Sequence, residues 1–109
     1  MSYDGHRAED DTVDQFFANA RSRVFWVEVA GSAHMNFSDY GFYVPFLQAL
    51  DPTVTAADYD VGTIDPSRMR TIMLAYVSAF FDKELRGARS DLLTPGSKRF
   101  PEAPLVIVH

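Results

Sequence analysis

The residues with the clearest capacity for chemistry stand directly after a run of apolar residues. Residues 24–30 are mostly β-branched or aromatic, and Gly31 ends the run. His34 follows at the place where open α/β sheets bind their ligands, outside the carboxyl end of a strand. Its unperturbed pKa of about 6.5 lets a histidine take up and return a proton near neutral pH. His34 is therefore a candidate general base.

The elements around this histidine predict an α/β fold. The run 24–30 is interrupted only by Glu28, and a nearly continuous apolar strand is typical of a parallel sheet with helices on both faces. A helix is predicted before the strand, over residues 11–21. Its apolar residues recur at helical spacing and predict one buried face: Val13, Phe16, Phe17 and Ala20.

A second predicted helix follows and has clear ends. Asp65 suits the N-cap, Pro66 suits the first helical position, and Gly87 suits the stop. This helix is about six turns long by the 3.6-residue period. Its predicted buried face consists of Met69, Ile72, Met73, Tyr76, Val77 and Phe80.

The remaining segments are less regular. Residues 38–62 predict a loop with a short helix around residues 45–50, because two prolines interrupt the pattern. Residues 88–104 predict a loop. The apolar residues 105–108 predict an edge strand or a docked tail.

The segment Gly-Ser-Ala-His-Met-Asn-Phe-Ser-Asp, residues 31–39, resembles the histidine turn of α/β-hydrolases. It is similar to the Gly-x-x-His-x-x-Phe-x-Asp segment of platelet-activating-factor acetylhydrolase-like and dienelactone-hydrolase-like esterases and lipases. The resemblance covers about residues 11–87 and leaves 88–109 as a C-terminal tail. It implies that residues 1–109 are one partial domain, the C-terminal fragment of that fold, with a mostly parallel sheet and flanking helices.

The resemblance also implies roles for particular residues. The activity would be hydrolysis of a carboxylic ester or another acyl compound, with His34 as the general base. Phe37, Tyr40 and Phe42 would line or cover the pocket. The triad acid has two possible positions. Asp4 has the spacing of about thirty residues seen in many α/β-hydrolases; in the acetylhydrolase-like group the acid comes one strand earlier, outside this chain.

The nucleophile of such an enzyme is missing from the sequence. No Gly-x-Ser-x-Gly elbow occurs, and the residues before His34 are too few for the elbow and its flanking elements. Ser32 predicts only a turn with a local hydrogen bond. We expect a chain that supplies the histidine but is not active alone. Its partner would be the missing N-terminal part of the hydrolase, or a second copy through exposed strand edges. The alternative is a stand-alone α/β interaction domain without catalysis.

Composition narrows the possible partners. A net charge of −5 without a basic stripe argues against nucleic acid. No cysteine is present, and His6, His34 and His109 lack metal-ligand spacing, so neither a metal nor a disulfide is expected. Without a glycine-rich phosphate loop, no cofactor is expected either. No apolar stretch approaches the roughly 18 residues of a membrane span, and the cytoplasm is the expected location.

Overall fold

The apolar run forms the central strand of a small mixed sheet. The computed structural model describes residues 1–108. Within them, β2 (Val24–Val29) pairs in parallel with β1 (Ser2–Tyr3) and antiparallel with β3 (Leu105–Val108). The prediction of an α/β class is confirmed, and residues 105–108 form an edge strand. One strand pairing is parallel and one is antiparallel, because the chain returns after the long helix to lie beside β2 in the opposite direction.

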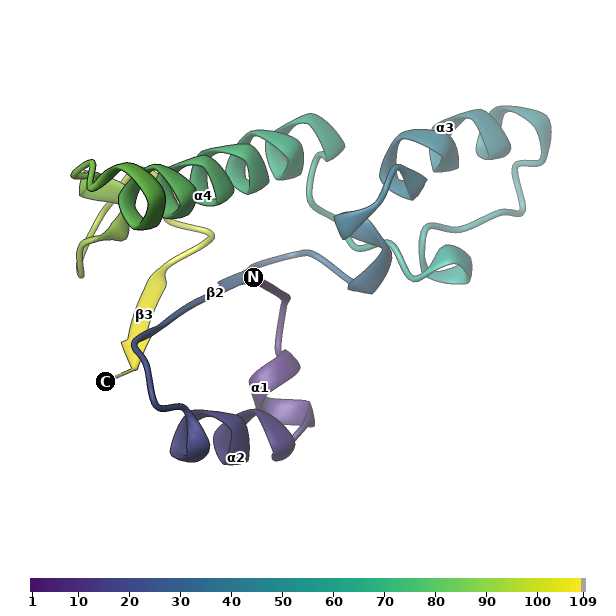
Figure 1. Cartoon of the computed structure of the whole chain (residues 1–109). Coiled ribbons are helices and arrows are strands. Elements are labelled where there is room, and N and C mark those ends of the chain that lie inside the picture. Colours follow the sequence, from purple (N-terminus) through teal and green to yellow (C-terminus); the bar gives the residue numbers. More distant parts are fainter. Residues whose placement is uncertain (109) are drawn as a thin grey trace.

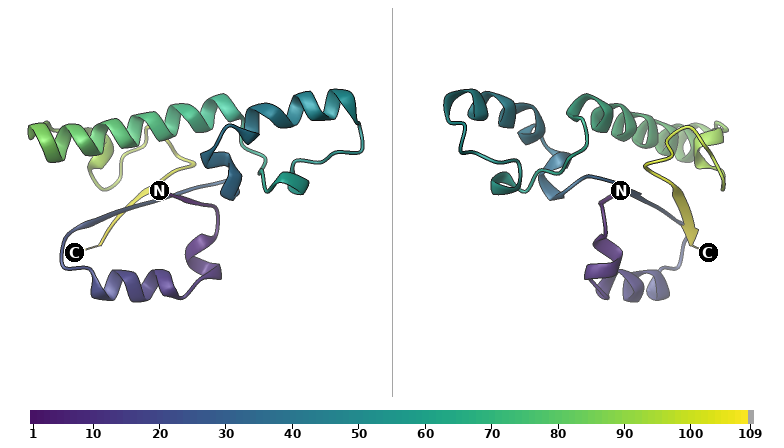
Figure 2. Two further views of the ribbon diagram at one scale, coloured as in Figure 1. Left: turned by 45° about the vertical axis from the view of Figure 1, so that its right-hand side comes forward. Right: turned by 180° about the vertical axis from the view of Figure 1, so that it is seen from behind.

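Helices cover both faces of this sheet (Figure 1). α4 (Pro66–Arg86) lies along one face, and α1 (His6–Glu9) and α2 (Thr12–Asn19) lie along the other. Figure 2 shows the same layers from two further directions. Successive side chains of a strand point to opposite faces. Accordingly, the ring centroids of Phe25 and Phe80 of α4 lie 6.0 Å apart. The next residue, Trp26, points to the other face, and its ring centroid lies 5.2 Å from that of Phe17 of α2.

α4 begins and ends as the sequence predicts, as one continuous helix. The Asp65 carboxylate accepts a hydrogen bond from the backbone N–H of Arg68 at 2.9 Å, and Gly87 adopts the left-handed conformation with φ 65°. Its buried face is narrower than predicted, since Val77 is 46% exposed and Phe80 is 38% exposed. Both line an open apolar hollow that Met1, Phe25 and Leu105 border from the side of the sheet.

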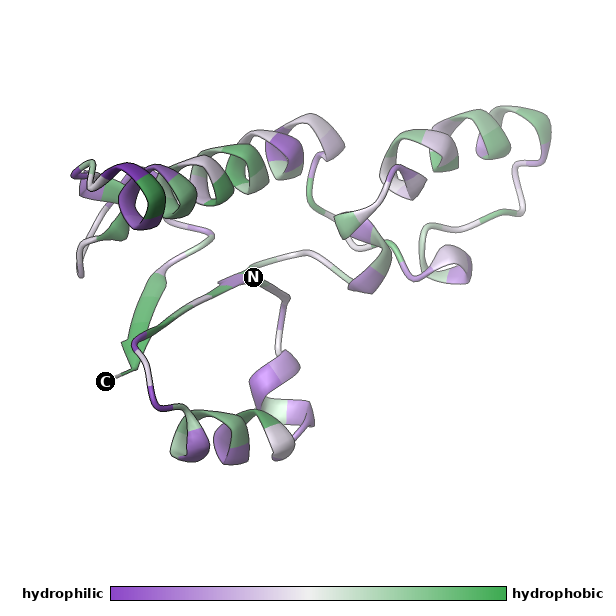
Figure 3. Ribbon diagram, in the orientation of Figure 1, coloured by the Kyte–Doolittle hydropathy of each residue, from purple (hydrophilic) through white to green (hydrophobic). Residues whose placement is uncertain are grey.

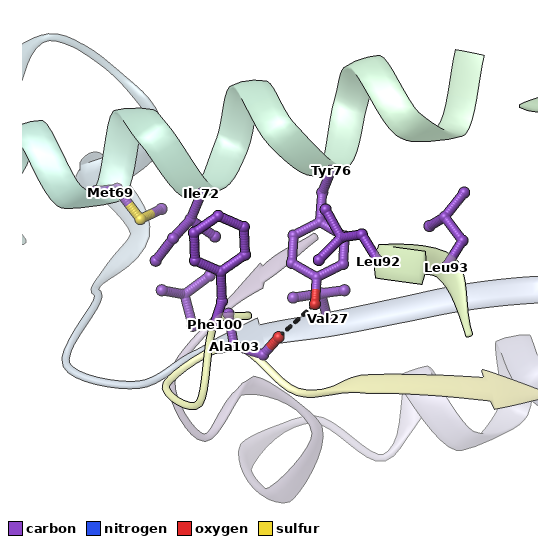
Figure 4. Packing of buried hydrophobic residues seen from close by; sticks show 9 residues of the cluster. Val27, Met69, Ile72, Tyr76, Leu92, Leu93, Phe100 and Ala103 are labelled. Atoms are coloured by element: carbon purple, nitrogen blue, oxygen red, sulfur yellow. Dashed lines mark hydrogen bonds between the residues drawn. The ribbon is translucent and has the colours of Figure 1, made fainter. Parts of the chain in front are cut away.

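The segment after α4 is mostly irregular, as predicted, but it contributes to the core. The 3-10 turn η3 (Asp91–Leu93) and the residues before β3 pack beneath α4 (Figure 4). The Tyr76 hydroxyl donates a hydrogen bond of 2.7 Å to the Ala103 carbonyl and fastens this segment to the helix. The main buried cluster consists of Val27, Val29, Met69, Ile72, Tyr76, Leu92, Leu93, Phe100 and Ala103.

α2 is shorter than the predicted helix and ends at Asn19. Val13 and Phe17 are buried against the sheet, whereas Phe16, predicted to be buried with them, is 56% exposed. A helix of about two turns places few side chains toward one surface, because successive residues are 100° apart around the axis.

α3 (Tyr40–Leu50) begins before the predicted helix and projects away from the sheet (Figure 1). It is followed by a 3-10 turn, η2 (Ala57–Tyr59). Hydrophobic residues run along most of α3 (Figure 3), and Phe46 and Leu50 are 72% and 85% exposed. Between residues 1 and 108, no helix combines the length and the apolar character that crossing a bilayer requires.

Candidate functional site

His34 lies just beyond the carboxyl end of β2, where the sequence places it. The chain leaves the strand through Gly31, whose φ of 75° is a conformation that favours glycine, and His34 opens the 3-10 turn η1 (His34–Phe37). The side chain is exposed. Within the described chain neither ring nitrogen makes a hydrogen bond, and the imidazole meets the Tyr3 ring edge to face at 6.3 Å. The imidazole is therefore accessible to a bound group.

The imidazole borders an open pocket of about 450 Å³ between β1, α1 and the η1 turn. Phe37, proposed from the sequence to line the pocket of an enzyme, borders this pocket. Tyr40 and Phe42, predicted as further lining residues, lie instead on the exposed surface of α3, because α3 leads away from the sheet immediately after the turn. The residues that line the pocket are Met1, Ser2, Tyr3, His6, His34, Met35, Phe37 and Ser38.

Asp4 follows β1 directly, so it lies at the carboxyl end of the strand parallel to β2. Its Oδ2 accepts a hydrogen bond from the Gly31 N–H at 2.9 Å, and its own N–H donates to the Ser32 carbonyl at 3.2 Å. No sequence pattern predicts a strand before Asp4, since β1 has only two residues. No hydrogen bond or ion pair joins Asp4 to His34 within residues 1–108. The structure thus fixes Asp4 to the histidine turn without bonding it to the imidazole.

Asn36 organises the turn from within, which the sequence did not reveal. It is only 5% exposed, and its Oδ1 accepts hydrogen bonds from the N–H groups of Ala33 at 2.7 Å and Gly62 at 2.8 Å. Gly62 packs so closely that an added Cβ would lie 2.1 Å from the Gly31 carbonyl oxygen. Asparagine often bonds local backbone groups, and this was the available sequence signal.

Ser32 has the structural role that the sequence predicts. Its hydroxyl donates a hydrogen bond of 2.7 Å to the Val29 carbonyl, and the residue is 6% exposed. It closes the turn after β2 and is not bonded to His34.

A second histidine reaches the same pocket, which the sequence also did not indicate. His6 stacks on Tyr3 with ring centroids 4.5 Å apart, and its Nδ1 is hydrogen-bonded to the Ser2 hydroxyl. Loss of solvation is the main cause that raises the pKa of Tyr3. The nearby carboxylates raise it further, with Glu9 and Asp10 contributing most among them. The phenol therefore stays neutral over the physiological pH range.

The site is not arranged as a metal centre. Over the described range, no three histidine, aspartate or glutamate side chains come together as ligands would. His109 lies outside the described residues.

Comparisons with protein-family models, with curated proteins and with solved structures give no significant match.

Proposed function

We propose that this chain is the C-terminal segment of a serine α/β-hydrolase and supplies the catalytic histidine, His34. One observation carries the proposal: the carboxyl ends of two parallel strands lie together, with Asp4 after β1, the exposed His34 after β2, and the Asp4–Gly31 hydrogen bond between them. The sequence resemblance of residues 31–39 supports it independently.

The chemistry would be acyl transfer to water. His34 takes the proton of a serine hydroxyl as that oxygen attacks the acyl carbonyl, and then returns it to the leaving group. A carboxylate at the second ring nitrogen stabilises the imidazolium, and Asp4 is the candidate in this chain. In this proposal the serine that His34 activates and the oxyanion donors come from another polypeptide segment, so the chain alone is not expected to turn over esters.

The test uses the DNA upstream of the Met1 codon, read in all three frames for an apolar strand followed by Gly-x-Ser-x-Gly. That polypeptide is co-expressed with this chain and assayed with p-nitrophenyl esters. We expect saturable steady-state hydrolysis from the pair, no steady-state turnover from either piece, and a loss of several orders of magnitude in His34→Ala. Absence of such a segment, or full activity of His34→Ala, contradicts the proposal.

A second candidate function is a stand-alone interaction domain without catalysis. The exposed apolar residues of α3, above all Phe46 and Leu50, favour it, because large exposed apolar groups mark interaction surfaces when they cluster. The same assay separates the two functions, since an interaction domain yields no ester hydrolysis in any combination.

A further inference from the structure

The beginning of the chain brings a serine, a histidine and an aspartate together beside the pocket. The Ser2 hydroxyl oxygen is hydrogen-bonded to His6 Nδ1. On the other side of the imidazole, His6 Nε2 lies 3.7 Å from Asp10 Oδ2. A hydroxyl bonded to a base, with a carboxylate beyond the other side of that base, resembles the arrangement of an activated nucleophile.

Each of these three side chains is held by contacts of its own. Pairing between β1 and β2 fixes the backbone of Ser2. The His6 ring stacks on Tyr3 with an interplanar angle of 22°. Asp10 Oδ1 accepts hydrogen bonds from Thr12, from the backbone N–H at 2.9 Å and from the hydroxyl at 2.6 Å. The three groups are therefore preorganised.

The electrostatics agree with this geometry. Hydrogen bonds from Thr12, and the attraction of His6, hold the pKa of Asp10 below its ordinary value. Asp10 is thus an anion at neutral pH and favours the imidazole tautomer with its proton on Nε2. That tautomer leaves Nδ1 as the acceptor of the Ser2 hydroxyl proton.

We propose that Ser2 is an acyl-accepting nucleophile, with His6 as its general base and the Asp10 carboxylate stabilising the imidazolium that forms. Ser2 is only 5% exposed, but it borders the open pocket of about 450 Å³. Because so little of Ser2 is exposed, the acyl donor that fits is an activated ester of a small carboxylic acid.

The reaction is a simple acyl transfer. Ser2 Oγ attacks the ester carbonyl, its proton passes to His6 Nδ1, and a bond forms between Oγ and the acyl carbon. The bond to the leaving oxygen breaks, and that oxygen takes the proton from His6 or leaves as an anion while the proton goes to water. The new serine ester has a much poorer leaving group than the activated donor, so water attacks it more slowly than Ser2 attacks the donor, and one acyl group accumulates per chain. This inference does not rest on the proposed role of His34.

The experiment treats the whole chain with p-nitrophenyl acetate and follows p-nitrophenolate release and intact mass. We expect a burst of about one equivalent, the kinetic sign of an acyl-enzyme. Peptide mapping should place the acetyl group on Ser2, and hydroxylamine should remove it, as it removes an ester but not an amide. Ser38, a serine of the same pocket whose hydroxyl donates to the Met35 carbonyl, should stay unlabelled and serves as the internal comparison.

Two variants test the mechanism. Ser2→Ala, which removes one oxygen atom, should abolish the burst. His6→Phe keeps a ring against Tyr3 and should slow acylation by about 100-fold or more, and added imidazole should restore part of the rate. An unchanged burst in Ser2→Ala, or an acetyl group found on another residue, overturns the proposal. So does a wild-type rate in His6→Phe.

Discussion

The carboxylate of Asp4 accepts a hydrogen bond from the backbone N–H of Gly31, with 2.9 Å between Oδ2 and N. The bond joins the segments that follow the two parallel strands, and the bonded residues are 27 positions apart in sequence. Gly31 begins the turn that leads to His34. Asp4 therefore has a structural role at this turn whether or not it acts as the triad acid.

The two roles of Asp4 can be separated by substitution. Asp4→Asn keeps an oxygen acceptor for the Gly31 N–H, so we expect little change in stability. Asp4→Ala loses the bond and should lower the free energy of unfolding by roughly 1 kcal/mol. Thermal and urea unfolding measure the stability of both variants. In the co-expressed enzyme, both variants should lose activity if Asp4 is the acid, whereas an active Asp4→Asn would limit Asp4 to the structural role.

Gly62 should be intolerant of any side chain. Its added Cβ would lie 2.1 Å from the Gly31 carbonyl oxygen, which is backbone and cannot move aside cheaply. We expect Gly62→Ala to cost about 1–3 kcal/mol and to displace the histidine turn. Denaturant unfolding measures the cost, and NMR shifts of residues 31–37 report the displacement.

Gly41→Ala is the matched control for this substitution. Its added Cβ would meet Pro66 at 3.5 Å, an ordinary contact, and Gly41 lies inside α3. Alanine is favoured over glycine by roughly 0.5–1 kcal/mol in the middle of a helix and by less in the first turn, where Gly41 lies, so this variant should be neutral or slightly more stable. Equal losses in both variants would contradict the role given to the Gly62 contact.

The parts of the fold that were predictable are those with local signals. The two caps of α4 flank it directly and its apolar stripe lies within it, and its observed bounds match the predicted ones. The strand β1 was not predictable, because two residues carry no period and become a strand only by pairing with β2. The predicted start of α3, at Pro45, is wrong. Proline suits a first helical turn, but the helix begins at Tyr40 and contains Pro45.

The candidate site divides in the same way. The position of His34 was predictable because an apolar run, a glycine and a histidine follow one another within a few residues. Asn36 and Gly62 were not, since they meet across 26 residues, and only the folded chain brings them together. The Ser2–His6 bond was also missed, because a serine and a histidine four residues apart at the beginning of a chain carry no pattern of their own.

Stability should depend more on Ile72 than on Phe80. Ile72 lies on the buried face of α4 and is fully buried, whereas Phe80, placed in the core by its sequence spacing, is 38% exposed. Ile72→Ala should cost about 2–5 kcal/mol. Phe80→Ala removes a larger side chain but should cost less than the Ile72 variant. Chemical denaturation compares them, and a larger loss for Phe80→Ala would place that ring in the core after all.

The contact between Arg68 and Glu102 should make stability depend on pH. The Arg68 guanidinium donates a hydrogen bond to the Glu102 carboxylate, and this is the main reason why the pKa of Glu102 lies below its ordinary value near 4.5. The unfolded chain then binds more protons in that range, so stability rises with pH. The stabilisation is complete above the ordinary value and is lost as the pH falls through the lower folded value.

Glu102→Gln tests this dependence, since it keeps the shape of the side chain and removes its titration. Between pH 7 and pH 3 the Tm of the variant should fall less than that of the wild type. Arg68→Gln should have the same effect, and the double variant should add nothing further. A parallel fall in all four proteins would show that the contact is not coupled to folding.

The outer edge of β3 should promote self-association. β3 is the last strand of the sheet beyond β2, its four residues are apolar, and Val106 is 42% exposed. An apolar edge strand with unpaired backbone groups is a template for pairing with a second copy, and a lysine on such an edge opposes that pairing. We expect light scattering to show a mass that rises with concentration, and Val106→Lys to reduce the rise. Ala18→Lys adds the same charge on the exposed surface of α2 and is the matched control. If both lysine variants reduce the rise equally, net charge and not the β3 edge governs association.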